Sequence, residues 1–129
     1  MARFAAFFVL WVASATLGIA QPEIFNPLRD AIKSNDAAAL VKSFAVSVDI
    51  NLEGNINTYS KAQSEFLLKD FFKKHPVTDF TIVHTGSSKG GLQFAIGRYL
   101  SAKESYNVLI RVRQVGEPYL VHEISFVKE

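Results

Sequence analysis

The sequence contains no cysteine among its 129 residues. This absence excludes disulfides, thiolate metal sites and a lipid anchor on an acylated cysteine. Histidine is scarce as well, and His75, His84 and His122 have neither the H-x-H nor the H-x-x-x-H spacing of a metal-binding pair. Stability must therefore come from burying Phe, Val, Ile and Leu side chains, and neither a metal nor another cofactor is expected.

The chain also lacks any block of like charge, because its 14 Lys and Arg residues nearly balance 12 Asp and Glu residues. Nucleic acid is therefore not expected as a partner. The one long apolar run, Phe4 to Leu17, follows the single charge of Arg3 and ends in small residues up to Ala20. This pattern predicts a signal peptide over residues 1–20, and the run is too short for a spanning helix. We expect one domain, residues 21–129, exported to the periplasm or outside, without a stable membrane anchor.

Two nucleotide-binding motifs are missing too. The glycine-rich run Gly86 to Gly91 places Lys89 before Gly90, and a strand pattern follows. A phosphate-binding loop needs its lysine after the last glycine and a helix directly behind it. No G-x-G-x-x-G opens a helix, and the one G-x-S-x-G match, Gly86 to Gly90, precedes a strand pattern and is therefore no nucleophile elbow. The run is therefore predicted to be a turn between two strands.

The elements that are present follow a clear order along the chain. Asn26-Pro27 begins a short helix, a second covers about 37–43, and alternation from Phe44 predicts a strand. Ser60 and Gln63 form a capping box, followed by a helix up to Pro76 with Phe66, Phe71 and Phe72 among the residues of one broad apolar side. Four alternating segments complete the chain: 78–85, 92–100, 106–114 and 119–127. The predicted class is α+β, with a curved antiparallel sheet wrapped around helices.

Several local strings resemble a known family. FFKKHPVTDFTIVHTGSSKGGLQFAIGRY, with YNVLIRV and LVHEISF after it, is similar to an uncharacterised bacterial family of exported domains with the cone-shaped nuclear-transport-factor-2-like (cystatin-like) fold. The similarity covers nearly all of residues 21–129 and is most specific at Phe71-Phe72, His84-x-Gly86 and Ile96-Gly97. It implies the fold but no catalytic residues, because the family is a domain of unknown function. The wider superfamily contains enzymes as well as binding and dimerisation modules.

The strand register predicts a concave pocket. Aligning the strands by their turns gives a row of Ile82, Ile96, Ile110 and His122, with Phe80 and Arg98 in the next row and His84 beside Phe94. The predicted ligand site comprises eight residues: His84, Arg98, His122, Phe80, Ile82, Phe94, Ile96 and Ile110. Its basic groups in an apolar cone favour a small anion, while the alternative is that each is an ordinary core or rim residue.

The same register predicts what the other face of the sheet carries. Small and apolar residues occupy its middle, and the predicted interface comprises Val83, Ala95, Tyr99, Leu109, Arg111, Val121 and Glu123. Such a face is typical of a two-fold homodimer, although antiparallel sheets also commonly leave one face in solvent.

The predicted function follows from what the cone lacks. Enzymes of the superfamily pair an Asp or Glu with a His or Tyr inside the cone, because proton abstraction needs a buried base. Asp49, Glu53, Asp79 and Glu123 alternate with the buried set and are expected to face outward. The sequence therefore favours a non-catalytic exported module that binds a small ligand or a protein. The alternative is a small isomerase-, lyase- or hydrolase-like enzyme that uses His122 or His84.

Overall fold

The protein, represented by a computed structural model, is described over residues 21–129. The predicted signal peptide, residues 1–20, lies outside the described residues. The described part contains the following elements: η1 (Gln21–Phe25), α2 (Asn26–Lys33), α3 (Ala37–Val41), β1 (Phe44–Leu52), β2 (Asn55–Ser60), α4 (Lys61–Lys74), β3 (Asp79–Ser88), β4 (Leu92–Ser101), β5 (Glu104–Gln114) and β6 (Tyr119–Lys128). The order of helices and strands agrees with the α+β prediction.

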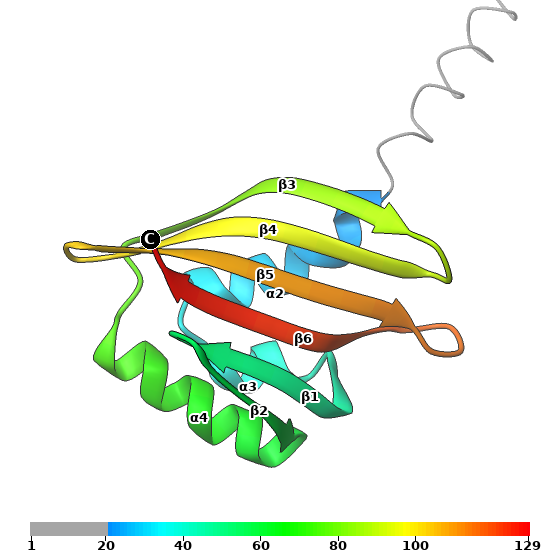
Figure 1. The fold of residues 1–129 in the computed structure, drawn as a ribbon, viewed down its shortest axis with the longest axis horizontal. Helices are drawn as coiled ribbons and strands as arrows, with labels where there is room; N and C mark the ends of the chain where they lie inside the picture. Colours follow the sequence, from blue (N-terminus) through cyan, green and yellow to red (C-terminus); the bar gives the residue numbers. More distant parts are fainter. Residues whose placement is uncertain (1–20) are drawn as a thin grey trace, which may run out of the picture.

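Six strands form one sheet in the order β2-β1-β6-β5-β4-β3. The last four strands pair antiparallel with their neighbours in sequence, so the predicted meander is confirmed. The strand β1 joins the meander by parallel pairing with β6, which the alternation pattern did not predict. The curved sheet lies in front of α2 and α3 in Figure 1, and α4 lies beside the β1–β2 hairpin.

The glycine-rich run is a turn, as predicted. β3 extends to Ser88 and β4 begins at Leu92, with Gly90 and Gly91 between them at φ angles of +78° and +74°. Glycine reaches this left-handed region without steric cost, whereas other residues are strained there. A strand follows the turn, so no helix amides are available to hold a phosphate at this loop.

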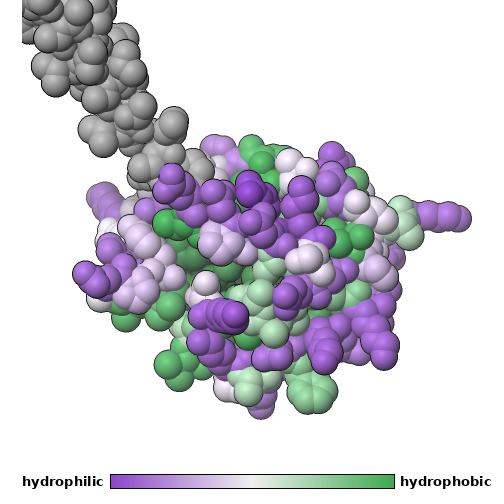
Figure 2. Space-filling model, turned by 180° about the vertical axis from the view of Figure 1, so that it is seen from behind, coloured by the Kyte–Doolittle hydropathy of each residue, from purple (hydrophilic) through white to green (hydrophobic). Residues whose placement is uncertain are grey.

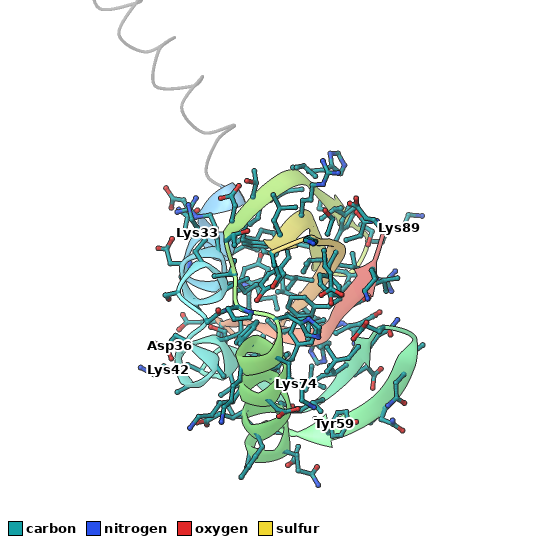
Figure 3. All side chains as sticks on the ribbon, turned by 90° about the vertical axis from the view of Figure 1, so that its left-hand side faces the viewer. Lys33, Asp36, Lys42, Tyr59, Lys74 and Lys89 are labelled. Atoms are coloured by element: carbon teal, nitrogen blue, oxygen red, sulfur yellow. The ribbon has the colours of Figure 1, made fainter. Side chains whose placement is uncertain are left out.

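The space between the sheet and the helices is filled by aromatic side chains (Figure 3). Phe71 of α4 lies at their centre, with its ring centroid 4.8 Å from that of Phe126 and 5.4 to 5.9 Å from those of Tyr106 and Tyr99. Phe72 is buried beside Phe71. The concave side of the sheet is therefore a packed core, in which Ile50, Leu68, Ile110 and Ile124 are also buried.

Helix α4 begins at the predicted capping box. The Ser60 hydroxyl accepts from the Gln63 amide at 3.2 Å, and the Gln63 side chain accepts from the Ser60 amide at 3.0 Å. Phe66 is 81% exposed, so the prediction that it shares the buried side of this helix is wrong. Phe66 precedes Phe71 by five residues, which separates the two side chains by about 140° around a helix.

In one strand, β4, the side chains point to the opposite faces of the sheet from those predicted. In β4, the buried side chains are Ala95 and Tyr99, with Gly97 between them, whereas Phe94 and Ile96 are only half-buried. Ile110 pairs with Ala95 instead of Ile96, so the predicted register is wrong by one residue at this pair. A shift by one residue moves every side chain of a strand to the other face of the sheet.

The reason lies in side chains from neighbouring elements. A methyl group added at Gly97 would lie 2.8 Å from the Phe80 ring and 2.9 Å from the Thr81 carbonyl oxygen. The Phe80 ring therefore occupies the concave space above Gly97, and small residues in β4 leave room for it. The convex face receives Phe94 and Ile96, which alternate with the small residues Ala95 and Gly97.

The surface on the helix side is mostly hydrophilic, with smaller apolar patches between the charged residues (Figure 2). Among residues 21–129, no helix has the length and hydropathy that membrane crossing requires.

Candidate functional site

The eight residues of the predicted ligand site do not converge. Phe80, Ile82 and Ile110 lie on the concave face, in the core or packed against it. Phe94 and Ile96 lie on the convex face, because the side chains of β4 point to the opposite faces from those predicted. The prediction that all these apolar residues line one concave pocket is therefore wrong.

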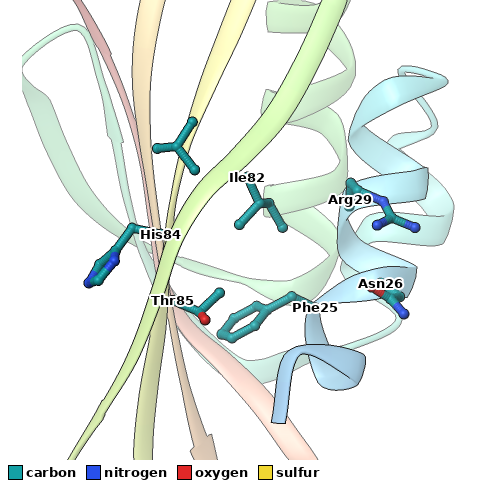
Figure 4. A pocket seen from close by; sticks show the side chains of 7 residues that line it. Phe25, Asn26, Arg29, Ile82, His84 and Thr85 are labelled. Carbon is teal, nitrogen blue, oxygen red and sulfur yellow. The ribbon is translucent and has the colours of Figure 1, made fainter. Parts of the chain in front are cut away.

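The three basic residues of the predicted site are also separated. Arg98 is exposed and its guanidinium binds the Glu129 carboxylate at 3.0 Å. His84 points to the opposite side of β3 from Ile82 (Figure 4). His122 is the extra residue of a bulge in β6, and its Nε2 is buried with no hydrogen-bond partner among the described residues. Bulges in β3 and β6 broke the regular alternation on which the prediction relied.

The predicted interface divides in the same way. Leu109, Arg111 and Glu123 lie on the convex face, where the Arg111 guanidinium is 3.5 Å from the Glu123 carboxylate. Val83 is at the bulge of β3 and is 61% exposed. Three of the seven predicted residues are instead buried in the core: Ala95, Tyr99 and Val121.

A hollow of about 430 Å³ lies between the N-terminal helices and β3. Phe25, Asn26 and Arg29 line it from η1 and α2, and Ile82 and Thr85 line it from β3 (Figure 4). Phe25 is fully buried and Ile82 packs against the core, so the hollow combines apolar floor residues with polar groups at its rim. Such a mixture is typical of small-ligand sites. Val83 and His84 also line it.

A second hollow of about 460 Å³ adjoins the first, because Arg29 and Ile82 line both. We call the two hollows together the α2–β3 groove. The Arg29 guanidinium donates two hydrogen bonds of 3.2 Å to one Asp30 carboxylate oxygen. Lys33 also lines the groove and has no ion-pair partner among residues 21–129. Two cations and one carboxylate therefore border the groove, which gives it a positive character.

A polar network at the end of α4 was not predicted from the sequence. His75, which follows the last residue of α4, has its Nδ1 2.9 Å from the Glu104 carboxylate and 3.2 Å from the Tyr106 hydroxyl. The Glu104 carboxylate also binds Lys128 at 2.8 Å, and Glu53 lies 3.7 Å from the same ammonium. These five residues come from four separate parts of the chain. No local spacing could have identified them.

The network shifts the pKa of three members: Glu104, Tyr106 and Lys128, whose pKa is raised mainly by its hydrogen bond with Glu104. The hydrogen bond from Lys128 is the main reason that the pKa of Glu104 lies below its usual value. Burial is the main reason that the pKa of Tyr106 is well above its usual value, and the negative charge of Glu53 adds to the effect. The residues that line the α2–β3 groove include none of these five. The network therefore fastens the end of α4 to the sheet without bordering this groove.

The described part of the chain shows no arrangement of side chains suited to binding a metal ion. Residues 21–129 contain no group of three His, Asp or Glu side chains placed to bind one ion. Although two carboxylates surround His75 in the polar network, both are engaged by the Lys128 ammonium.

The comparison with protein families agrees with this fold. The family model "Domain of unknown function (DUF4783)" matches residues 25–127. The chain belongs to this family. No curated protein matches the sequence. The DUF4783 assignment confirms the resemblance to an uncharacterised family with this fold.

Solved structures share the fold of this DUF4783 domain. A DUF4783 family protein from Bacteroides uniformis ATCC 8492 is 25% identical, with a TM-score of 0.75 over 80% of this chain and 94% of that one. A cystatin-like domain from Nostoc punctiforme PCC 73102 is 12% identical, with a TM-score of 0.66 over 85% and 75% of the two chains. An NTF2-like protein of unknown function from Shewanella baltica OS155 is 11% identical, with a TM-score of 0.64 over 83% and 89%. The predicted cystatin-like, nuclear-transport-factor-2-like fold is confirmed.

Proposed function

We propose that this DUF4783 domain is a non-catalytic exported module that binds an anionic group of a small ligand or protein partner in the α2–β3 groove. The observation that carries the proposal is that Arg29 lines the same hollow as the apolar residues Phe25 and Ile82. The ion pair with Asp30 does not prevent binding, because Arg29 is partly exposed and Asp30 largely exposed, and solvent-accessible pairs contribute only about 0 to 1 kcal/mol. An entering carboxylate can therefore replace Asp30 at the guanidinium.

The packed interior supports binding over catalysis. Aromatic rings fill the concave side, and neither His84 nor His122 forms a hydrogen bond with a carboxylate among the described residues. A general base needs an orienting partner and access to substrate. The alternative of a small isomerase-, lyase- or hydrolase-like enzyme that uses His122 or His84 has correspondingly less support.

Titration with benzoate tests the site, because benzoate combines a carboxylate with an apolar ring. We expect saturable chemical-shift changes at α2 and β3, and about fivefold weaker binding by Arg29→Gln, since one exposed charge contributes up to about 1 kcal/mol. Lys42→Gln removes the same charge outside the groove, from an exposed position after α3, and is expected to leave binding unchanged. Benzylamine is not expected to bind. Equal binding of benzoate by both variants would reject the groove as the site.

Export depends on residues 1–20, outside the described part of the chain. If the signal peptide is removed after Ala20, the secreted protein begins at Gln21. Mass spectrometry of protein from the periplasmic fraction of an expressing bacterium measures this directly. A chain that stays in the cytoplasm with its N-terminus intact contradicts the export proposal.

Self-association through the convex face is a second candidate. Phe94 and Ile96 point to the convex face, where Ile96 pairs with Leu109. These apolar side chains are only half-buried in one copy of the protein. Arg111 and Glu123 are adjacent on the same face, so a two-fold partner can place its own Glu123 near Arg111. An apolar centre with a charged border is the usual composition of a protein interface.

Light scattering tests this second candidate. We expect a dimer for the parent protein and a monomer for Leu109→Glu, which places a charge in the apolar centre. Ala38→Glu adds the same charge at an exposed position of α3, on the helix side, and is expected to remain dimeric. A monomeric parent at high concentration rejects the dimer.

A further inference from the structure

The strand β3 forms one edge of the sheet, and its first residues, Asp79 to Ile82, precede the bulge that interrupts this edge. It pairs with β4 on one side only, and no backbone group of Phe80 to Ser88 forms a hydrogen bond outside that pairing among the described residues. The strand has ten residues and contains neither lysine nor proline. Natural edge strands are usually short or carry such residues, because free backbone donors and acceptors attract another strand.

The α2–β3 groove lies alongside this free edge. Its two hollows follow the strand from Phe80 to Thr85, and α2 provides the opposite wall with Arg29 and Lys33. Figure 4 shows Ile82 and Thr85 pointing from β3 toward the helix side. A strand added beside β3 would direct every second side chain to this side of the sheet. The free edge and the groove can therefore bind one ligand together.

We propose that an extended peptide pairs with the free edge of β3 and places alternating apolar and acidic side chains in the α2–β3 groove. The inference rests on the proposed function and names its ligand. The backbone edge selects an extended chain, since only another strand matches its donors and acceptors. Ile82 and Phe25 select an apolar side chain, whereas Arg29 and Lys33 select a carboxylate two residues away.

The bulge of β3 limits the length of the guest. The pairing with β4 shifts between Ile82 and His84, so Val83 interrupts the regular edge. A regular guest strand can therefore pair with Asp79 to Ile82, next to Lys33 and Arg29. The same interruption opposes pairing of two complete β3 strands from two copies of the protein.

Calorimetry with a capped peptide of the sequence Val-Thr-Glu-Thr-Val-Thr-Glu tests the proposal. Its odd positions place valine and glutamate on one side of the extended chain, and threonines occupy the other. We expect one-to-one binding by the exported protein and about tenfold weaker binding of the peptide with lysine at both glutamate positions, because two exposed charges are reversed. Lys33→Gln is expected to weaken binding, whereas Lys42→Gln, with the same charge change, is not.

Backbone methylation separates strand pairing from simple charge attraction. Alternate residues of a strand point their amides toward the same neighbour. N-methylation of either the odd or the even residues should therefore weaken binding about tenfold, through loss of two or more hydrogen bonds, while methylation of the other set has little effect. Equal effects of the two sets overturn strand pairing.

The outcomes separate this inference from the proposed function. Binding of benzoate without binding of the peptide overturns the peptide inference and leaves the anion site intact. Failure of both ligands overturns both. A protein dimer that the peptide dissociates would show that a second copy occupies the edge, and it would also overturn the inference.

Discussion

The concave and convex faces of the sheet differ most clearly in β4, which contributes side chains to both. On the concave face, this strand offers Ala95 and Gly97 before the large ring of Tyr99. On the convex face, it offers Phe94 and Ile96, both half-buried. Around Gly97, the larger apolar side chains thus lie on the face that the helices do not cover.

The difference shows that the shape of the neighbouring elements decides the buried face of a strand. The Phe80 ring needs the space that a side chain at Gly97 would fill. The concave face gains its buried volume from rings that other elements supply, including Phe71 and Phe126. The small residues Ala95 and Gly97 of β4 make that packing possible.

The largest expected effect concerns the centre of the concave face. Phe71→Ala should lower the free energy of unfolding by about 3 to 5 kcal/mol, because it removes a buried ring that packs on several other rings. Phe66→Ala on the same helix removes an exposed ring and should change stability by about 0.5 kcal/mol or less. Urea denaturation of both variants measures the difference. Similar losses in the two variants would contradict this placement of α4.

A smaller loss of stability is expected for a substitution at Gly97, where β4 has no room for a larger side chain. Gly97→Ala should cost about 1 to 3 kcal/mol, because the new methyl group would meet the Phe80 ring and the Thr81 carbonyl. Combining it with Phe80→Leu removes the ring and should recover part of the loss, which a double-mutant cycle of urea midpoints detects. Strict additivity of the two substitutions would contradict direct contact.

The polar network beside the concave core should make stability depend on pH. Since the folded pKa of Glu104 lies below its usual value, its stabilising contribution is present above the ordinary carboxyl pKa and is lost as the pH falls through the folded pKa. The urea midpoint should therefore decrease less in Glu104→Gln than in the parent between pH 6 and pH 3. Glu117→Gln, in the turn before β6, is the charge-matched control. An unchanged pH profile in Glu104→Gln contradicts the assignment.

The smallest effect on folding is expected on the convex face. Ile96→Thr keeps a β-branched side chain and removes apolar surface from a position that is only half-buried. The free energy of unfolding of the monomer should fall by about 1 kcal/mol or less. Thermal unfolding at low protein concentration measures this change. A loss as large as that of Phe71→Ala would show that the convex face is covered.

The sequence alone determined the order of elements and most of their ends. The capping box at Ser60, the positions of the last four strands and the glycines of the β3–β4 turn are local signals, and the structure confirms each of them. Local signals succeed because a cap, a strand period or a positive φ depends on residues that are neighbours in sequence. The family resemblance added the cone-shaped arrangement.

Only the tertiary structure decided which residues meet. The bulges at Val83 and His122 changed the register. The Phe80 ring takes the concave space at Gly97, so the small residues of β4 face the core. The α2–β3 groove and the network around His75 join residues that are far apart along the chain. Each of these features depends on how side chains of different elements share one volume, which no periodicity within a single segment records.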